Sequence, residues 1–132
     1  MSVVVGYVAT PEGGAALDAA VAEAEARKVP LVVILSERSH RFGAEAPDVE
    51  RHAEELRTRL AGSGVEHEVR VTGKGNDVAE EIIGAAEASA AHLIVIGLRR
   101  RSPVGKLLLG SNAQRILLDA PCPVLAVKPP VT

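Results

Sequence analysis

A segment rich in glycine and arginine near the carboxyl terminus has the residues best suited to hold a small anion. Gly97 is followed by Arg99, Arg100 and Arg101, and residues 97–132 together carry six basic side chains and one acidic one, a net charge of +5. The whole chain has a net charge of −2, so positive charge is concentrated here. The segment predicts a site for a small anionic ligand, and a solvated basic face is the alternative that charge alone leaves open.

The end of this segment is expected to start a helix. Ser111 with Gln114 three residues later has the spacing of a capping box, and Gly110 before it allows a ligand to approach the backbone closely. The amides of Asn112 and Ala113 then lack partners at the helix start. The helix dipole adds about 0.3–1 kcal/mol to the binding of an anion at such a position.

Other familiar binding motifs are incomplete in this sequence. A Walker phosphate loop fails because Leu107 follows Gly105-Lys106. A dinucleotide fingerprint beginning at Gly73 fails because Val78 stands at its third glycine position. The four histidines share no metal-ligand spacing, and the single Cys122 excludes an internal disulfide and a multi-cysteine zinc site. We therefore expect no metal site built by the chain alone.

The composition narrows the possible partners. Aromatic residues make up 2% of the 132 residues, which argues against stacking platforms for single-stranded nucleic acid. The sequence pI near 6.1 argues against a general polyanion binder. No targeting segment is visible, and no apolar run reaches the roughly 18 residues of a membrane span. The expectation is a soluble cytoplasmic protein that binds neither nucleic acid nor membranes.

The elements that position these residues alternate regularly between strand and helix. Thr10 and Pro11 have the residue types of an N-cap and a first helical position, and Gly62-Ser63-Gly64 ends a second apolar-striped stretch. Strands are expected at residues 2–8, 31–35, 65–71, 92–96 and 124–127, and helices starting near residues 11, 48, 77 and 111.

This alternation predicts an α/β fold with a five-stranded parallel doubly wound sheet and helices on both faces. Near-continuous apolar strands belong at the centre, whereas the alternating third strand and the proline-flanked fifth strand belong at the edges. The predicted strand order is 3-2-1-4-5, within a single domain of residues 1–132. Ligands bind such sheets where the winding direction reverses, so we expect the site beside the connections at residues 8–11 and 97–111.

The sequence resembles the universal stress protein family over essentially its whole length. The phosphate loop of that family has a glycine after the fourth strand, a second glycine three residues later, and Gly-Ser or Gly-Thr after nine more residues. Gly97, Gly110 and Ser111 stand in that register, and residues 120–125 resemble a frequent ending of the family. Residues 77–80 and 90–97 also resemble its third helix and fourth strand.

The resemblance implies an adenine nucleotide site that takes ATP or AMP, with Mg²⁺ accompanying ATP. Gly97 would lie beside the ribose, and Gly110, Ser111 and Asn112 would hold the phosphates. The resemblance also implies that Gly6, Val8, Leu35 and Ile96 wall the adenine. The local positive charge makes Arg99, Arg100 and Arg101 further candidate phosphate contacts, and Thr10 after the first strand is a candidate ligand contact as well.

Two residues depart from the family pattern. Arg100 replaces the second loop glycine, where its guanidinium either blocks close approach or serves as a charged phosphate donor. Val8 replaces the usual aspartate after the first strand. Loss of a charged hydrogen-bond acceptor lowers the favourable free energy of nucleotide binding by about 1.5–3 kcal/mol, which corresponds to roughly ten- to hundredfold weaker binding.

Three functions follow from these features. The favoured one is a nucleotide-binding module in stress response or signalling, without efficient catalysis. The alternative is a dimeric stress or interaction protein with a vestigial pocket, and in either case the edge strand Val124–Val127 could pair two copies into a homodimer. An ATPase or nucleotidyl transferase is disfavoured because the two connections contain no acidic residue to hold Mg²⁺ or act as a base, although slow ATP hydrolysis stays open.

Overall fold

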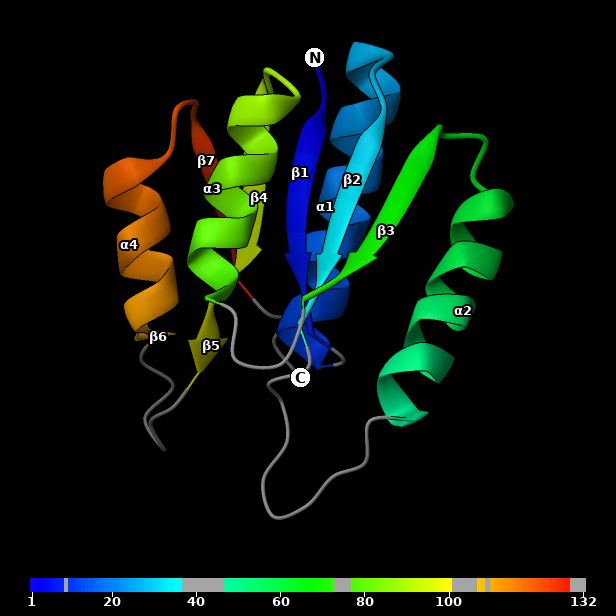
Figure 1. Ribbon diagram of the computed structural model, residues 1–132, viewed down its shortest axis with the longest axis horizontal. Coiled ribbons are helices and arrows are strands. Elements are labelled where there is room, and N and C mark those ends of the chain that lie inside the picture. Colours follow the sequence, from blue (N-terminus) through cyan, green and yellow to red (C-terminus); the bar gives the residue numbers. More distant parts are fainter. Residues whose placement is uncertain (9, 37–46, 73–76, 101–106, 109, 129–132) are drawn as a thin grey trace.

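Five parallel strands form one sheet in the order β3-β2-β1-β4-β7 (Figure 1). The computed structural model describes residues 1–8, 10–36, 47–72, 77–100, 107–108 and 110–128. The strands of the sheet are β1 (Val3–Tyr7), β2 (Leu31–Leu35), β3 (His67–Val71), β4 (Leu93–Gly97) and β7 (Val124–Val127). This confirms the predicted order 3-2-1-4-5, with β7 as the fifth predicted strand. Strand β2 is buried throughout, whereas β3 at the edge alternates between half-buried and exposed residues.

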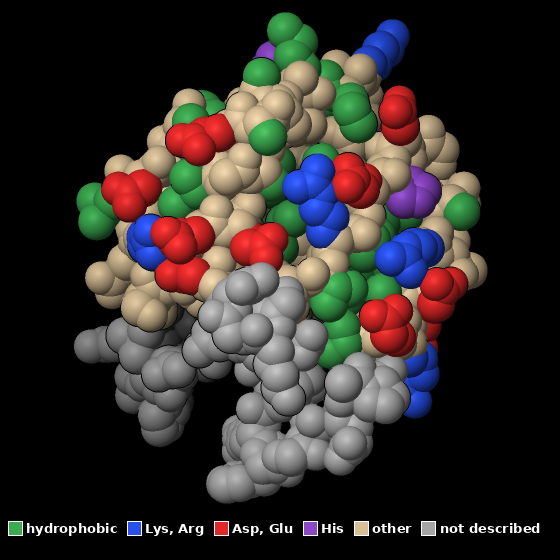
Figure 2. Space-filling view, in the orientation of Figure 1, with side chains coloured by type: hydrophobic (Ala, Val, Ile, Leu, Met, Phe, Trp, Pro, Cys, Tyr) green, Lys and Arg blue, Asp and Glu red, His purple; other side chains and the backbone are tan. Residues whose placement is uncertain are grey.

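Four helices connect the strands as right-handed crossovers require. They are α1 (Pro11–Arg27), α2 (Pro47–Ala61), α3 (Val78–Ala88) and α4 (Ser111–Asp119). Helix α1 begins as predicted, because the Thr10 hydroxyl accepts a hydrogen bond from the Gly13 amide at 3.1 Å. Charged side chains lie over the outer surfaces of the helices in Figure 2, and Arg27 pairs with Glu23 one turn earlier on α1. Among the described residues, no helix is long and apolar enough to cross a membrane.

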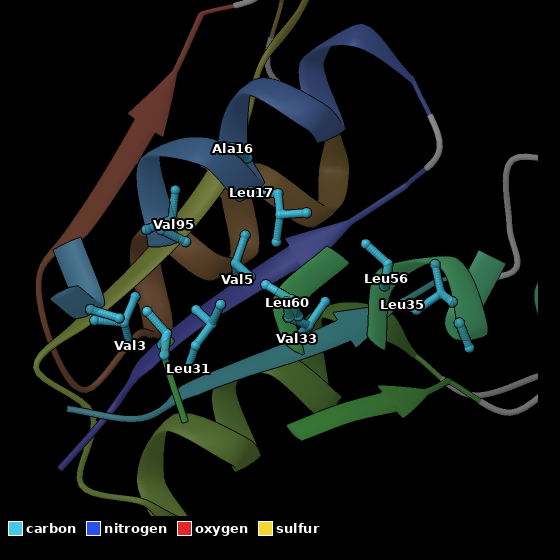
Figure 3. Packing of buried hydrophobic residues seen from close by; sticks show 14 of the residues in the cluster. Val3, Val5, Ala16, Leu17, Leu31, Val33, Leu35, Leu56, Leu60 and Val95 are labelled. Atoms are coloured by element: carbon cyan, nitrogen blue, oxygen red, sulfur yellow. The ribbon is translucent and has the colours of Figure 1, made fainter. Parts of the chain in front are cut away.

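Side chains alternate between two hydrophobic clusters, one on each face of the sheet. Val3, Val5 and Leu35 point toward α1 and α2, as Figure 3 shows. Their neighbours Val4 and Ile34 pack instead under α3 and α4. Successive residues of the central strands therefore pack against different helical layers, which explains why these strands are apolar at consecutive positions.

The connection after β4 contains two features that the sequence did not indicate. A two-residue strand, β5 (Arg99–Arg100), pairs antiparallel with β6 (Leu107–Leu108). The predicted capping box at Ser111 is wrong, because Gly110 is the N-cap of α4 and makes no side-chain cap hydrogen bond. Ser111 is the first helical residue, and the Gln114 amide donates to the Gly110 carbonyl at 3.0 Å. Glycine is itself an acceptable N-cap, so the helix begins one residue before the serine could cap it.

Candidate functional site

The carboxyl edges of β1 and β4 meet the start of α1 through backbone contacts. Gly97 ends β4 against the first turn of α1, where a Cβ atom on residue 97 would lie 2.5 Å from the carbonyl oxygen of Glu12. The next amide, of Leu98, donates to the carbonyl of Val127 at 2.8 Å and holds β7 alongside. The fold therefore requires glycine at position 97 independently of any ligand.

The residues after β1 are held just as closely to α1. The Thr10 amide donates to the Val8 carbonyl at 2.8 Å, and a Cβ atom on Gly13 would collide with that same carbonyl oxygen. The Thr10 hydroxyl is already used as the helix cap. Val8 is half-buried at the position where the resemblance expects an aspartate.

The start of α4 offers open backbone amides. Gly110 is exposed and extended, with φ −73° and ψ 170°, and among the residues that the structure describes no atom beyond its chain neighbours lies within 4 Å of a Cβ atom built on it. Ser111 is exposed and Asn112 half-buried. The first amides of a helix have no acceptor within it, so those of Ser111 and Asn112 point outward at the positive end of the helix dipole. Nothing in the packing of the described chain requires glycine at position 110, in contrast to position 97.

The predicted adenine walls divide between the two faces of the sheet. Gly6 and Ile96 belong to the α3 and α4 side, where a Cβ atom on Gly6 would lie 2.8 Å from Cδ1 of Ile82. The Leu35 side chain is instead buried in the cluster under α1 and α2. The structure thus brings Gly6 and Ile96 to one face of the sheet and places the Leu35 side chain on the other face. The backbone of Leu35 ends β2 at the same carboxyl edge of the sheet.

The arginines predicted to reach the phosphates follow β4 directly. Arg99 and Arg100 form β5, opposite Leu108 and Leu107, and Arg101 lies outside the described residues. In Figure 1 the arrowheads of β1, β2 and β3 point to the lower edge of the view, where α1, α3 and α4 also begin. The β5 strand lies at that edge too, and its partner β6 ends two residues before Gly110, the N-cap of α4.

Arg115, which contributes to the local positive charge, is occupied by acidic partners. It contacts Asp77 at 2.8 Å and Glu80 at 3.1 Å, both at the start of α3, and Asp119 at 3.7 Å. The hydrogen bond with Glu80 is the largest cause that raises the pKa of Arg115. Figure 2 shows acidic side chains gathered over α3 and α4 in this region. The charge available to an anion therefore comes from the other basic residues.

Two residues at this edge were not anticipated. The Glu12 backbone contacts Gly97, which brings an acidic residue of α1 beside the site although the two connections themselves have none. Thr72, directly after β3, is 3% exposed, and its hydroxyl has no hydrogen-bond partner within the described part of the chain. An acid in the first turn of a helix is a recognisable signal, whereas no pattern in the sequence distinguishes Thr72.

Groups that could serve other chemistries are absent or inert in the described segments. In those ranges no three His, Cys, Asp or Glu residues are placed to hold a metal ion. Cys122 is half-buried, and its burial raises the pKa of the thiol, which disfavours the nucleophilic thiolate.

Comparison of this chain with known proteins identifies one matching family and several related proteins. The model of the universal stress protein family matches residues 1–128. A universal stress protein of Mycolicibacterium smegmatis is 47% identical over 135 residues, which cover 96% of this chain and 97% of that protein.

Solved structures agree in fold. The structure of a universal stress protein from Archaeoglobus fulgidus has a TM-score of 0.77 and 30% identity, covering 97% of this chain and 98% of that one. A structure of the universal stress protein from the same organism in complex with dAMP has a TM-score of 0.74 and 26% identity, with the same coverage of both chains.

Proposed function

This chain belongs to the universal stress protein family, and from that premise we propose that residues 1–132 form one domain that binds an adenine nucleotide at the carboxyl edge of β1 and β4. The relative of known structure that binds dAMP is 26% identical and covers the whole sheet. Its ligand supports an adenine nucleotide, AMP or ATP, as the ligand of this chain. Mg²⁺ would accompany ATP and neutralise part of its phosphate charge.

The observation that carries this proposal is the open space at Gly110. Gly97 and Gly13 are explained by the backbone of α1 and β1, but within the described ranges no atom beyond the adjoining residues lies within 4 Å of a Cβ at Gly110. A glycine there fits a phosphate that approaches the backbone, with the Ser111 and Asn112 amides as donors. Arg99, Arg100 and Arg101 add positive charge, while Thr10, Gly6, Val8, Leu35 and Ile96 remain the predicted contacts toward the ribose and base.

The proposed role is binding rather than turnover, as a stress-response or signalling module. Val8 removes the usual acceptor after β1, so nucleotide binding should be roughly ten- to hundredfold weaker than with aspartate at this position. The connections at residues 8–11 and 97–111 contain no carboxylate to activate water. Glu12 is an acid that the structure adds beside Gly97, and ATP turnover that disappears in Glu12→Gln would favour slow hydrolysis as a second activity.

Calorimetric titration of the full chain with AMP, ATP and dAMP tests the proposal. We expect saturable binding, and at least tenfold weaker binding in Gly110→Val, because the added side chain fills the space that the phosphate needs. Gly84→Val is the matched control: this glycine lies on α3, where the described residues also leave open space, and the variant should bind as the wild type does. The absence of saturable binding at millimolar nucleotide would overturn the proposal.

The second candidate is a dimeric interaction module whose pocket is vestigial. The half-buried Val8 at the usual aspartate position is the observation that favours it. If the wild type binds no nucleotide and Val8→Asp or Arg100→Gly restores binding, this alternative replaces the first.

In either case we propose a homodimer formed by the β7 edge. The carbonyls of Pro123 and Val127 accept hydrogen bonds from Ile94 and Leu98 of β4, at 3.0 and 2.8 Å. Backbone groups alternate in direction along a strand, so those of Val124 and Ala126 face the open side. An unpaired edge of this kind can join its copy about a two-fold axis. Of the four large exposed apolar residues in the described ranges, three lie on α4 and β7: Leu117, Leu118 and Leu125.

A further inference from the structure

A buried hydroxyl without a partner lies at the carboxyl edge of the sheet. Thr72 is 3% exposed, and its amide donates to the Leu35 carbonyl at 2.9 Å. Its Oγ1 atom makes no hydrogen bond within the described part of the chain. Buried polar atoms in native proteins are nearly always paired, so an unpaired one is a candidate for a group that meets its partner only when a ligand arrives.

The hydroxyl lies in line with the proposed nucleotide site. The Ser36 amide donates to the Tyr7 carbonyl at 3.0 Å, so the pairing of β1, β2 and β3 continues one residue past each strand. Thr72 is therefore two strands away from the residues that follow β1. At the usual strand spacing this is about 10 Å, a distance comparable with the length of a nucleoside.

Thr72 also lies on the side of the sheet where the open amides are. The side chains of Leu35 and Val71 belong to the cluster under α1 and α2. Successive side chains of a strand point to opposite faces, so that of Thr72 points to the α3 and α4 side. Gly6 and the first turn of α4 are on that same side.

Given the proposed function, on which this inference rests, the two ends of the site have different chemistry. The phosphates occupy the start of α4 beside β4, and the base must extend along the edge toward β2 and β3. A threonine hydroxyl both donates and accepts, so it can pair with an exocyclic amino group or with a ring nitrogen. We propose that Thr72 Oγ1 hydrogen-bonds the polar edge of the nucleotide base and contributes to base recognition.

Three substitutions of the full chain test this assignment. Thr72→Val removes the hydroxyl while retaining the shape, Thr72→Ser retains the hydroxyl, and Thr58→Val makes the same chemical change at an exposed position on α2. AMP affinity is measured by calorimetry, and stability without ligand by urea denaturation. We expect Thr72→Val to weaken AMP binding about fivefold to tenfold, while Thr72→Ser and Thr58→Val stay within about twofold of the wild type.

The stability measurement shows whether the hydrogen-bond partner of Thr72 Oγ1 is the ligand or a group already present in the free protein. Removing a buried hydroxyl that has no hydrogen bond in the free protein does not lower the free energy of unfolding. Thr72→Val should therefore unfold at an equal or higher urea concentration than the wild type. A lower midpoint would overturn the inference, because it would mean that a water or protein group already satisfies the hydroxyl. AMP binding unchanged in Thr72→Val would also overturn it and leave the proposed function intact, whereas a wild type that binds no nucleotide would overturn the function itself.

Discussion

At the scale of single residues, two glycines of the site differ in what surrounds them. Gly97 lies against the Glu12 backbone, whereas Gly110 has open space around it in the described part of the chain. Gly97→Ala should lower the free energy of unfolding by about 1–3 kcal/mol, as overpacking does. Gly110→Ser, which keeps a favoured N-cap residue at this position, should change it by less than about 0.5 kcal/mol. Urea denaturation of both variants measures this contrast, and equal losses would show that the two glycines share a structural role.

The ionisation of Tyr7 can be followed by ultraviolet absorbance without overlap from other residues, because the chain has one tyrosine and no tryptophan. Burial is the largest cause that raises the pKa of Tyr7 above its ordinary value of 10.0, and nearby Arg59 opposes it. Absorbance at alkaline pH should therefore show phenolate forming later in the folded protein than in urea.

The sign of the linked stability change follows from the same shift. Above the unfolded pKa the unfolded chain loses the Tyr7 proton while the folded chain keeps it, so the folded state binds more protons. The contribution to stability is complete below the unfolded pKa and is lost as the pH rises through the folded pKa. Tyr7→Phe should unfold with a smaller alkaline decline than the wild type. Identical declines in the two proteins would contradict the assignment.

At the scale of elements, Asp77 joins two helices with one carboxylate. Its Oδ1 atom accepts from the amides of Ala79 and Glu80, which caps α3, and its Oδ2 atom contacts Arg115 of α4. Asp77→Ala should lower the unfolding free energy by about 0.5–2 kcal/mol through the lost cap. Asp77→Asn retains the cap acceptor and should lose less. Thermal denaturation measures both, and an equal loss in the two variants would assign the effect to the ion pair instead.

The main elements could be predicted from the sequence because each carries a strong local signal. Thr10-Pro11 starts α1, and the stripe of Val49, Ala53, Leu56 and Leu60 forms the buried side of α2. The β5–β6 pair could not be predicted, since two-residue strands have no periodicity. The capping box failed because Ser111 and Gly110 are both acceptable caps, and only the path of the chain decides between them.

For the candidate site, the sequence could indicate positions in the chain but not the surroundings of each residue. The resemblance to the family's phosphate loop selected Gly97 and Gly110, but it could not show that a backbone contact requires the first glycine and that the described residues leave space around the second. The face to which Leu35 points depends on strand register. The unpaired hydroxyl of Thr72 depends on everything packed around it, which a single residue type does not encode.

At the scale of the whole molecule, the edge strand β7 carries the prediction of a dimer. Ala126→Pro removes an amide that faces away from β4, so it should block pairing between copies while leaving the sheet intact. Sedimentation should show a dimer for the wild type and for the control Ala126→Thr, and a monomer for Ala126→Pro. A wild type that is monomeric at high concentration, or a proline variant that remains dimeric, would exclude this edge as the interface.

The backbone contacts of α1 have a consequence for how this architecture diverges. Gly13 touches the Val8 carbonyl and Gly97 touches the Glu12 carbonyl, so main-chain atoms fix the approach of α1 to β1 and β4. Side chains can drift at neighbouring positions without moving that approach, provided that both glycines persist. Related proteins could therefore change ligand while keeping the same arrangement of α1, β1 and β4. Glycine at positions 13 and 97 would be the feature that they share.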